Sequence, residues 1–438
     1  MKRSVNRGFV LLLLLVMVVA GAACDGDSGT ASTPGAACDA WTTPIVFAHG
    51  FLEVGDAFAN QSMRFAANGY CQSRIYAFDW NTLGGRDDEV LRLTAFIDDV
   101  LDETGAGAVD LIGHSAGTGL SFSYLSEPEN AAKVAHYANV AGFSADEPPG
   151  GVPTISLSSE DDLIVGISHV EGAENVEIPD LDHLQIITSA ETFFQLYRFF
   201  NDGAEPATTD MEPTDEVILS GRLLSFGINQ PAGGTEMRIY PFDPATGERL
   251  QPLPAATFVS DDEGNWGPFD AVAGQHYEYE VINSHPFWRP IHYYREPLPR
   301  SCDLVYCRTF PPVLSMVGMG LALLPYNDCH TLLATLIMNQ AIVAGRDSFF
   351  VDGYELSTGD ITPAEKTTIA AFFFDANGNG QSDAVAPGFL GGFPFIQIFD
   401  LYIEAEPDRP IPFVFNGRTM AVRNWMSDTE GIPIAVFE

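Results

Sequence analysis

Basic residues are scarce in this chain of 438 residues. It holds 21 Lys and Arg against 59 Asp and Glu, so the formal net charge is 21 − 59 = −38. Binding to nucleic acid needs clustered basic side chains that neutralise phosphates, and docking on anionic lipid head groups needs the same charges. The composition therefore argues against both kinds of partner.

The sequence also lacks zinc-site spacings and internal repeats. Six cysteines are present, but no CxxC pair or His/Cys cluster has the spacing of a zinc site. Hydrophobic residues make up 46% of the chain and charged residues only 18%. This balance excludes a charge-rich disordered chain and predicts two or three domains with buried cores.

Residues 1–23 have the layout of a secretory signal. Three basic residues precede an apolar run over residues 9–20, which is too short for a stable membrane span. Small residues then lead into Cys24, as in a bacterial lipoprotein signal, although Gly21 replaces the more usual aliphatic residue. We expect export to the bacterial cell envelope with a lipid anchor at Cys24. The alternative is ordinary cleavage that releases a soluble, secreted protein.

The remaining cysteines fit an exported protein. Cys38 and Cys71 each precede an apolar, strand-like run, which predicts a disulfide between neighbouring strand ends. Cys302, Cys307 and Cys329 are then left over. Simple counting predicts one further disulfide and one free thiol among these three, without saying which pair forms.

The rest of the chain is predicted to contain a tether, a linker and two domains. Residues 24–40 are polar and suit a flexible tether. Residues 41–202 alternate short apolar runs with helical patterns, which predicts a parallel sheet covered by helices on both faces. Residues 203–215 contain two Pro and no apolar period, so they form the predicted linker. Residues 216–438 carry strand-like runs parted by turns, which predicts an all-β domain, as one sandwich or barrel or as two small modules.

Individual elements follow from these runs. In the first domain, strands are predicted over residues 45–48, 74–78, 109–112, 134–140, 152–157 and 175–179. In the second, strands are predicted over residues 217–226, 237–242, 277–282, 292–295, 349–354, 369–374 and 397–404. Helical spacing predicts one helix over residues 90–101 that ends at Gly105 and another over residues 189–200. The apolar run 313–324 is predicted to be a buried loop or strand, with a lipid contact as the alternative.

The motif G-x-S-x-G occurs at residues 113–117, between a predicted strand and a predicted helix. The two glycines allow a sharp strand-to-helix turn, which holds the Ser115 hydroxyl out of the sheet at the helix N-terminus. This context predicts that Ser115 is the nucleophile of an α/β hydrolase.

A serine hydroxyl needs a general base, and His183 is the predicted one. In α/β hydrolases the chain order is Ser, acid, His, with the histidine after the last strand. His183 follows the predicted strand at residues 175–179 and precedes the closing helix. His169 lies before that strand and is the weaker candidate.

The acid should follow the preceding strand, where it can hold the imidazole in the right tautomer. Glu160, Asp161 and Asp162 come directly after the run at residues 152–157. We choose Asp162, which is followed by Leu-Ile-Val, with Asp161 as the alternative and Glu160 behind it.

Acyl transfer also needs N–H donors for the oxyanion. One is the backbone N–H of Ala116, directly after the nucleophile. The other is expected from the turn after the first strand, at residues 49–51, and we assign it to the N–H of Phe51.

Several motifs resemble those of the archaeal two-domain lipases, which are α/β-hydrolase carboxylesterases followed by a β-rich, lipid-binding C-terminal domain. The specific stretches are residues 48–51 (AHGF), 63–70 (MRFAANGY), 109–118 and 131–136. Weaker similarity continues through residues 207–210, 239–241, 291–297 and 374–380. The resemblance implies hydrolysis of long-chain acyl esters, with Ser115 as nucleophile, His183 as base, and Phe51 and Ala116 as oxyanion donors.

The chain departs from this family at two places. The archaeal lipases carry their acid directly after the sixth strand, where this chain has Ala141, so we expect the acid in the loop of Asp161 and Asp162. The archaeal proteins also insert a helical lid, and only residues 79–88 fill that space here. We therefore expect a shallow, open site without interfacial activation by a lid.

A last motif has oxygen-bearing side chains at alternate positions around a glycine bend. These are the first ligand positions of a calcium loop, and they fall on Asp375, Asn377, Asn379 and Asp383. The twelfth position holds Ala386 instead of glutamate. The motif predicts either a structural Ca²⁺ that braces the β-rich half or a plain Asx-rich turn, and the ester chemistry itself requires no cofactor.

Together these features predict a secreted or lipid-anchored carboxylic ester hydrolase that acts on acyl-ester lipids through an acyl-enzyme. One alternative keeps the three catalytic residues but takes a polyester such as a polyhydroxyalkanoate. Another is a catalytically idle surface protein that binds lipid or glycan, and the ordered set of Ser115, Asp162 and His183 argues against it.

Overall fold

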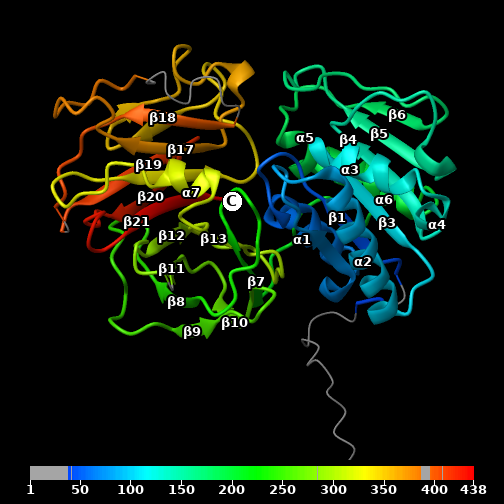
Figure 1. The fold of residues 1–438 in the computed structure, drawn as a ribbon, viewed down its shortest axis with the longest axis horizontal. Helices are drawn as coiled ribbons and strands as arrows, with labels where there is room; N and C mark the ends of the chain where they lie inside the picture. Colours follow the sequence, from blue (N-terminus) through cyan, green and yellow to red (C-terminus); the bar gives the residue numbers. More distant parts are fainter. Residues whose placement is uncertain (1–37, 41, 284, 386–394, 407) are drawn as a thin grey trace, which may run out of the picture. The chain divides into compact units, whose positions relative to one another are not determined.

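The structure of this protein is a computed structural model, which describes residues 38–40, 42–283, 285–385, 395–406 and 408–438 (Figure 1). The predicted signal sequence and Cys24 lie outside the described residues, as does Ala386. None of the helices in the described part of the chain combines the length and apolar character needed to cross a membrane.

The first half is built on a six-stranded sheet in the order β2-β1-β3-β4-β5-β6. Its strands are β1 (Ile45–Ala48), β2 (Ile75–Phe78), β3 (Val109–His114), β4 (Val134–Val140), β5 (Thr154–Ser158) and β6 (Glu174–Glu177). Every neighbouring pair is parallel. The predicted parallel sheet is therefore confirmed.

Helices cover both faces of this sheet (Figure 1). Neighbouring residues of one strand therefore pack into two different hydrophobic cores, one on each face. The helices are α1 (Ala59–Ala67), α2 (Arg86–Thr104), α3 (Ala116–Leu125), α4 (Pro128–Ala131), α5 (Gln185–Thr188) and α6 (Ala190–Phe200). Val46 and Leu111 pack with residues of α2 and α3. Phe47 and Ile112 pack with residues of α1, α5 and α6. This alternation is the period-2 geometry of a strand that is buried on both sides.

Helix α2 shows how closely local signals set its ends. Its first turn carries three acidic residues that favour the positive end of the helix dipole. Its last residue is followed by Gly105 at φ 63°, a left-handed conformation that glycine adopts without strain. The predicted end at Gly105 is confirmed.

The described residues of the second half form three sheets. Their strands are β7 (Glu216–Ser225), β8 (Glu236–Pro241), β9 (Ala256–Val259), β10 (Asn265–Val272), β11 (Tyr277–Ile282), β12 (Ile291–Arg295), β13 (Cys307–Thr309), β14 (Leu333–Ile337), β15 (Phe349–Val351), β16 (Tyr354–Glu355), β17 (Ala370–Phe374), β18 (Ile396–Asp400), β19 (Pro410–Phe415), β20 (Arg418–Arg423) and β21 (Ile432–Phe437). The sheets have the orders β10-β7-β13, β18-β17-β14-β21-β12-β11-β8-β9 and β16-β15-β19-β20. The last strand, β21, lies parallel to both β12 and β14 and so joins early and late strands in one sheet. The β-rich character is confirmed, although the sequence patterns missed several strands, among them β10, which has eight residues, and β19, β20 and β21, which have six each.

The apolar run at residues 313–324 differs from its predicted buried loop or strand. It contains the short helix α7 (Met316–Leu321), whose start is capped because the Ser315 hydroxyl accepts the Gly318 N–H at 3.0 Å. Four of its large apolar side chains are exposed by 53–87%, namely Leu314, Met316, Met319 and Leu323. An apolar composition alone did not reveal which side of the segment faces solvent.

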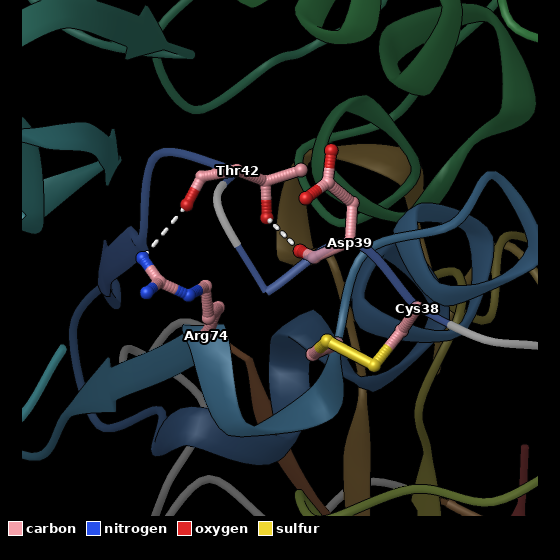
Figure 2. Close-up of a disulfide and its surroundings, with 5 residues drawn as sticks. Cys38, Asp39, Thr42 and Arg74 are labelled. Carbon is pink, nitrogen blue, oxygen red and sulfur yellow. Dashed lines mark hydrogen bonds between the residues drawn. A yellow bond between two sulfur atoms is a disulfide. The ribbon is translucent and has the colours of Figure 1, made fainter.

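A disulfide joins Cys38 to Cys71, with the two Cα atoms 5.0 Å apart (Figure 2). The chain beside it is paired as well, since the Asp39 N–H donates to Gly69 O at 2.8 Å. The Arg74 guanidinium donates to Thr42 O at 2.9 Å (Figure 2). The bridge therefore fastens the start of the described chain to the segment that leads into β2.

The second predicted disulfide is absent among the described cysteines, because Cys302, Cys307 and Cys329 are all free thiols. Cys302 pairs with Leu219 and Cys307 with Leu223, so the two cysteines lie four positions apart along β7. Four strand residues span roughly 13 Å, well beyond the Cα separation that a disulfide allows. The prediction was wrong because counting cysteines carries no information about strand register.

Candidate active site

Ser115 lies on the sharp turn between β3 and α3. Its backbone has φ 52° and ψ −119°, a strained conformation for a residue with a side chain. The flanking glycines permit it: a Cβ atom on Gly117 would lie 2.1 Å from Ala48 O, and one on Gly113 would lie 2.9 Å from Thr118 Cα. The motif is thus required by close packing of the helix start against β1 and β3.

The structure brings Ser115, His183 and Asp162 together. His183 Nε2 lies 2.8 Å from Ser115 Oγ, and His183 Nδ1 lies 2.8 Å from Asp162 Oδ2. The three residues come from the turn after β3, the loop after β6 and the loop after β5, at the carboxyl ends of their strands. Their exposed fractions are 9%, 3% and 1%, so the chain of hydrogen bonds is shielded from water.

Asp162 has the environment of a carboxylate that stays ionised. Its second oxygen, Oδ1, accepts the N–H groups of Ile164 at 2.9 Å and Val165 at 3.2 Å. Burial raises the pKa of Asp162, but the hydrogen bond and charge of His183 and the two N–H groups outweigh it, so the pKa lies below its ordinary value. The anion accepts the proton on His183 Nδ1, which leaves Nε2 free to accept the Ser115 hydroxyl.

The alternative residues lie elsewhere. Asp161 is exposed, and its Oδ2 accepts the Asp180 N–H at 3.1 Å. Glu160 is also exposed. His169 is exposed and lies 3.6 Å from Glu171. None of these side chains has a hydrogen bond to Ser115 or His183 among the described residues.

The turn predicted to donate to the oxyanion is tightly held. Residues 50–53 form a tight turn, in which the Glu53 N–H donates to Gly50 O at 3.3 Å and Leu52 has φ 60°. Phe51 is the second residue of this turn, and the hydrogen bond that closes the turn does not use the Phe51 N–H. Ala116 is the first residue of α3, where N–H groups have no partner within the helix. Gly117 packs against the backbone of Ala48 and His49, so the start of α3 and the turn at residues 50–53 lie close together.

A buried charge network that the sequence analysis missed lies behind these groups. His114, the second residue of the G-x-S-x-G motif, lies 2.9 Å from Glu53 Oε2 through Nδ1 and 2.9 Å from His183 O through Nε2. The same Glu53 oxygen accepts the Gly50 N–H at 2.7 Å. One ion pair therefore links the oxyanion turn to the backbone of His183. The only signal in the sequence is that Glu53 follows Gly50 by three residues, the spacing at which its side chain can turn back on that N–H.

The protonation of His114 follows from its partners. Both ring nitrogens face acceptors, a carboxylate and a carbonyl, so both must carry protons and the ring is an imidazolium. Burial lowers the pKa of His114, but the charge and hydrogen bond of Glu53 raise it more, to a value above the ordinary one. Burial likewise raises the pKa of Glu53, but His114 and the Gly50 N–H bring it down to about 2.

Exposed apolar side chains lie in the loops around this end of the sheet. Phe143 follows β4, while Leu163, Ile164 and Ile167 follow Asp162, and they are exposed by 37–60%. Residues 79–85, all described, run from β2 to α2 without a helix. The loops around the site therefore expose apolar side chains, and no helical lid is inserted between β2 and α2.

The polar groups of the calcium motif bind one another and Asp400 of β18. The Asp375 carboxylate accepts the N–H groups of Gly378, Asn379 and Gly380 at 2.8–3.1 Å. The Asn377 and Asn379 amides both donate to Asp383 Oδ2 at 2.9 Å. Within the described residues, no group of three or more His, Cys, Asp and Glu side chains is arranged to hold a metal ion. Asp375, Asn377, Asn379 and Asp383 each have an oxygen that already accepts a hydrogen bond within the loop.

The six-stranded parallel sheet and the strained turn that presents Ser115 to His183 define an α/β-hydrolase fold, here followed by β-rich sheets. Residues 42–125 match the class 2 lipase family, and residues 215–312 match the lipase C-terminal domain family. The chain is a carboxylic ester hydrolase of the lipase type. These matches do not extend to the archaeal subgroup that the sequence motifs resemble.

Solved structures of other hydrolases are similar to part of this chain. A predicted CIB-like hydrolase from Thermoplasma acidophilum is 18% identical over 37% of this chain and 87% of its own, with a TM-score of 0.30. Lipase B from Aspergillus fumigatus is 9% identical over 38% of this chain and 54% of its own, with a TM-score of 0.31. A Bacillus licheniformis lipase in propeptide form is 14% identical over 47% of this chain and 58% of its own, with a TM-score of 0.33.

Proposed function

We propose that this protein is an exported lipase that cleaves acyl esters through an acyl-enzyme on Ser115. The observation that carries the proposal is the buried chain of hydrogen bonds from Ser115 Oγ through His183 to Asp162, at 2.8 Å for each link. A weakly nucleophilic hydroxyl becomes reactive when an oriented base takes its proton during attack.

The reaction then follows in two halves. As Ser115 Oγ bonds to the ester carbonyl carbon, its proton passes to His183 Nε2, and the N–H groups of Phe51 and Ala116 receive the negative oxygen. His183 next gives that proton to the departing alcohol oxygen, and the carbon–oxygen bond of the ester breaks to leave the acyl-enzyme. Water repeats the sequence and releases the fatty acid. Asp162 remains ionised and stabilises the imidazolium in both halves.

Apolar groups around the site support a lipid substrate. The exposed side chains of Phe143, Leu163, Ile164 and Ile167 offer a surface on which an acyl chain can lie. The helix α7 segment adds a second exposed apolar surface, and no charged residue occurs between Arg308 and Asp328. In a chain with a net charge of −38, contact with lipid must be apolar, so we propose that this segment touches the lipid surface.

The test is hydrolysis of a p-nitrophenyl ester series from short to long acyl chains, with Ser115→Ala as the control. We expect turnover that persists at long chain lengths and falls to background in the variant, because the nucleophile is lost. Equal turnover by Ser115→Ala would refute the catalytic assignment. Hydrolysis of a polyhydroxyalkanoate film with no turnover of long acyl esters would favour a depolymerase instead.

Export and anchoring are part of the same proposal. The lipoprotein-like signal before Cys24 supports a tether in the cell envelope. Cys24→Ala in the full chain should move the protein from the membrane fraction to the soluble fraction. Unchanged partition between the two fractions would refute the anchor while leaving the catalytic proposal intact.

A further inference from the structure

The residue before the proposed general base is held by the carboxyl-terminal half of the chain. Asp182 lies directly before His183, and its Oδ2 atom accepts hydrogen bonds from the Arg346 guanidinium at 2.8 Å and from the Ala341 N–H at 3.0 Å. Only 9% of the Asp182 side chain is exposed. The carboxylate is shielded from water although 35% of the Arg346 side chain is exposed, so few water molecules compete for the Asp182 oxygens and the pair can fix a backbone position.

The same carboxylate also anchors the chain after His183. Its Oδ1 atom accepts the N–H groups of Leu184 and Gln185, both at 2.9 Å. The Gln185 side-chain oxygen in turn accepts from Arg346 at 3.0 Å. The chain directly after His183 is therefore bound to the carboxylate of the residue directly before it, and that carboxylate is bound to Arg346.

A second contact from this half falls on the imidazole itself. The Phe395 ring stacks on His183 with centroids 5.7 Å apart and an angle of 18° between the planes. Phe395 has φ 69°, a strained conformation for an aromatic residue, and its carbonyl accepts the N–H groups of Ile369 and Ala370 at 2.9 and 3.0 Å. These two hydrogen bonds offset the strain of the Phe395 backbone and hold it in the conformation in which the ring stacks on His183.

A third contact holds the oxyanion turn. Asn229, only 3% exposed, donates its side-chain amide to Glu53 O at 2.7 Å and to Trp80 O at 2.9 Å. Its φ of 53° is one that asparagine adopts more readily than most residues. Asn229 belongs to the loop between β7 and β8, so it too comes from the second half.

From these contacts we propose that the carboxyl-terminal half positions the catalytic groups, with Arg346 as the positioning residue for His183 and Asn229 as the one for the oxyanion turn. This inference rests on the proposed function and adds a role for the second half in the chemical step. It predicts that the contacts matter for small, water-soluble esters, for which lipid binding is irrelevant. The physical reason is that misplacing a reacting group by about 1 Å can cost on the order of 10²-fold in rate.

The experiment measures kcat and KM of the full chain on p-nitrophenyl acetate for Arg346→Gln and Arg346→Lys. The matched control is Arg409→Gln, because Arg409 forms a similar pair with Asp352 in the same half, at 2.6 Å and with 40% exposure against 35% for Arg346. We expect Arg346→Gln to lower kcat by about 10- to 100-fold with KM nearly unchanged. Arg346→Lys should recover part of kcat because it restores the charge, and Arg409→Gln should match the unsubstituted chain.

A second readout separates positioning from folding. The rate at which a fluorophosphonate labels Ser115 reports attack by the serine in one step, and melting temperatures report folding. We expect labelling of Arg346→Gln to slow in parallel with kcat, while Arg409→Gln labels normally even if both melt earlier. Asn229→Gly, which retains the backbone conformation but removes the amide, should also lower kcat.

The outcomes distinguish this inference from the proposed function. If Ser115→Ala is inactive and Arg346→Gln retains full kcat and labelling, the positioning role is refuted and the catalytic assignment survives. If Ser115→Ala retains activity, the catalytic assignment itself fails. An equal loss of kcat in Arg346→Gln and Arg409→Gln would also overturn the inference, because general destabilisation would then explain both.

Discussion

Replacing Glu53 with glutamine tests the buried network that joins the oxyanion turn to His183. The change keeps the shape of the side chain but removes the negative charge that pairs with His114 at 2.9 Å. The His114 side chain is fully buried and that of Glu53 is 11% exposed, so water cannot replace the lost partner. We expect both the folded state and the chemical step to weaken.

The magnitude follows from the pKa of Glu53, which falls from 4.5 to about 2 in the folded protein. A shift of this size corresponds to about 3 kcal/mol of folding free energy. That value agrees with the cost of about 3–5 kcal/mol for removing one partner of a buried ion pair. The Gly50 N–H also loses a charged acceptor, so we expect kcat to fall by about 10- to 100-fold as the Phe51 donor shifts.

The pH dependence has a defined sign. The contribution of Glu53 is present above pH 4.5 and is lost as the pH falls through about 2, because its folded pKa is depressed. The contribution of His114 is present below pH 6.5 and is lost as the pH rises through its raised folded pKa. The pair of Glu53 and His114 therefore stabilises the folded state most between pH 4.5 and 6.5. The difference in free energy of unfolding between the unsubstituted chain and Glu53→Gln should shrink at alkaline pH.

The assay is urea denaturation at pH 5.5 and pH 9 for Glu53→Gln, His114→Gln and the double variant. We expect the double variant to lose less than the sum of the single losses, with a coupling energy near the upper end of the usual range of about 0.5–3 kcal/mol. Glu171→Gln is the matched control, because Glu171 and His169 form an exposed pair at 3.6 Å that should contribute nothing measurable. Additive losses, or a loss that does not depend on pH, would refute the network.

Three further predictions concern other parts of the molecule. Asp162→Asn should lower kcat on the order of 10³- to 10⁴-fold while Asp161→Asn stays near the unsubstituted rate, and the reverse order in a p-nitrophenyl ester assay would contradict the choice of acid. Met319→Asp should weaken binding to zwitterionic vesicles in a flotation assay, whereas Leu253→Asp should not, although Leu253 is the more exposed of the two apolar residues (73% against 53%). Equal effects would argue against lipid contact by α7. Cys71→Ser should lower the free energy of unfolding by about 3–4 kcal/mol, because the disulfide closes a loop with a sequence separation of 33, and an unchanged urea midpoint would contradict this.

A fifth prediction concerns calcium. The oxygens of Asp375 and Asp383 are bound by N–H groups of their own loop, so a cation would have to displace existing hydrogen bonds. We expect neither added Ca²⁺ nor a chelator to move the melting temperature of the protein. A clear rise in melting temperature with Ca²⁺, abolished by Asp383→Asn, would show that the loop binds the ion.

The sequence by itself determined the features that depend on local spacing and chain order. The alternation of apolar runs with helical patterns predicted the parallel sheet, because strand and helix periods differ within a few residues. The G-x-S-x-G turn identified Ser115, and the order of strands singled out His183 and Asp162. These inferences need only the rule that parallel strands end at one edge of a sheet, so loops that follow different strands meet there.

The tertiary structure alone decided what depends on register and on packing between distant segments. Cys302 and Cys307 lie apart along β7 because of strand register. The segment around α7 exposes Met316 and Met319 while Leu321 packs against the core, and only the packing of this short helix decides which side chains are exposed. The contacts of Arg346 with Asp182 and of Phe395 with His183 join residues 164 and 212 positions apart in the chain. No local period carries information over such distances, since these hydrogen bonds and ring contacts exist only once both halves have folded against each other.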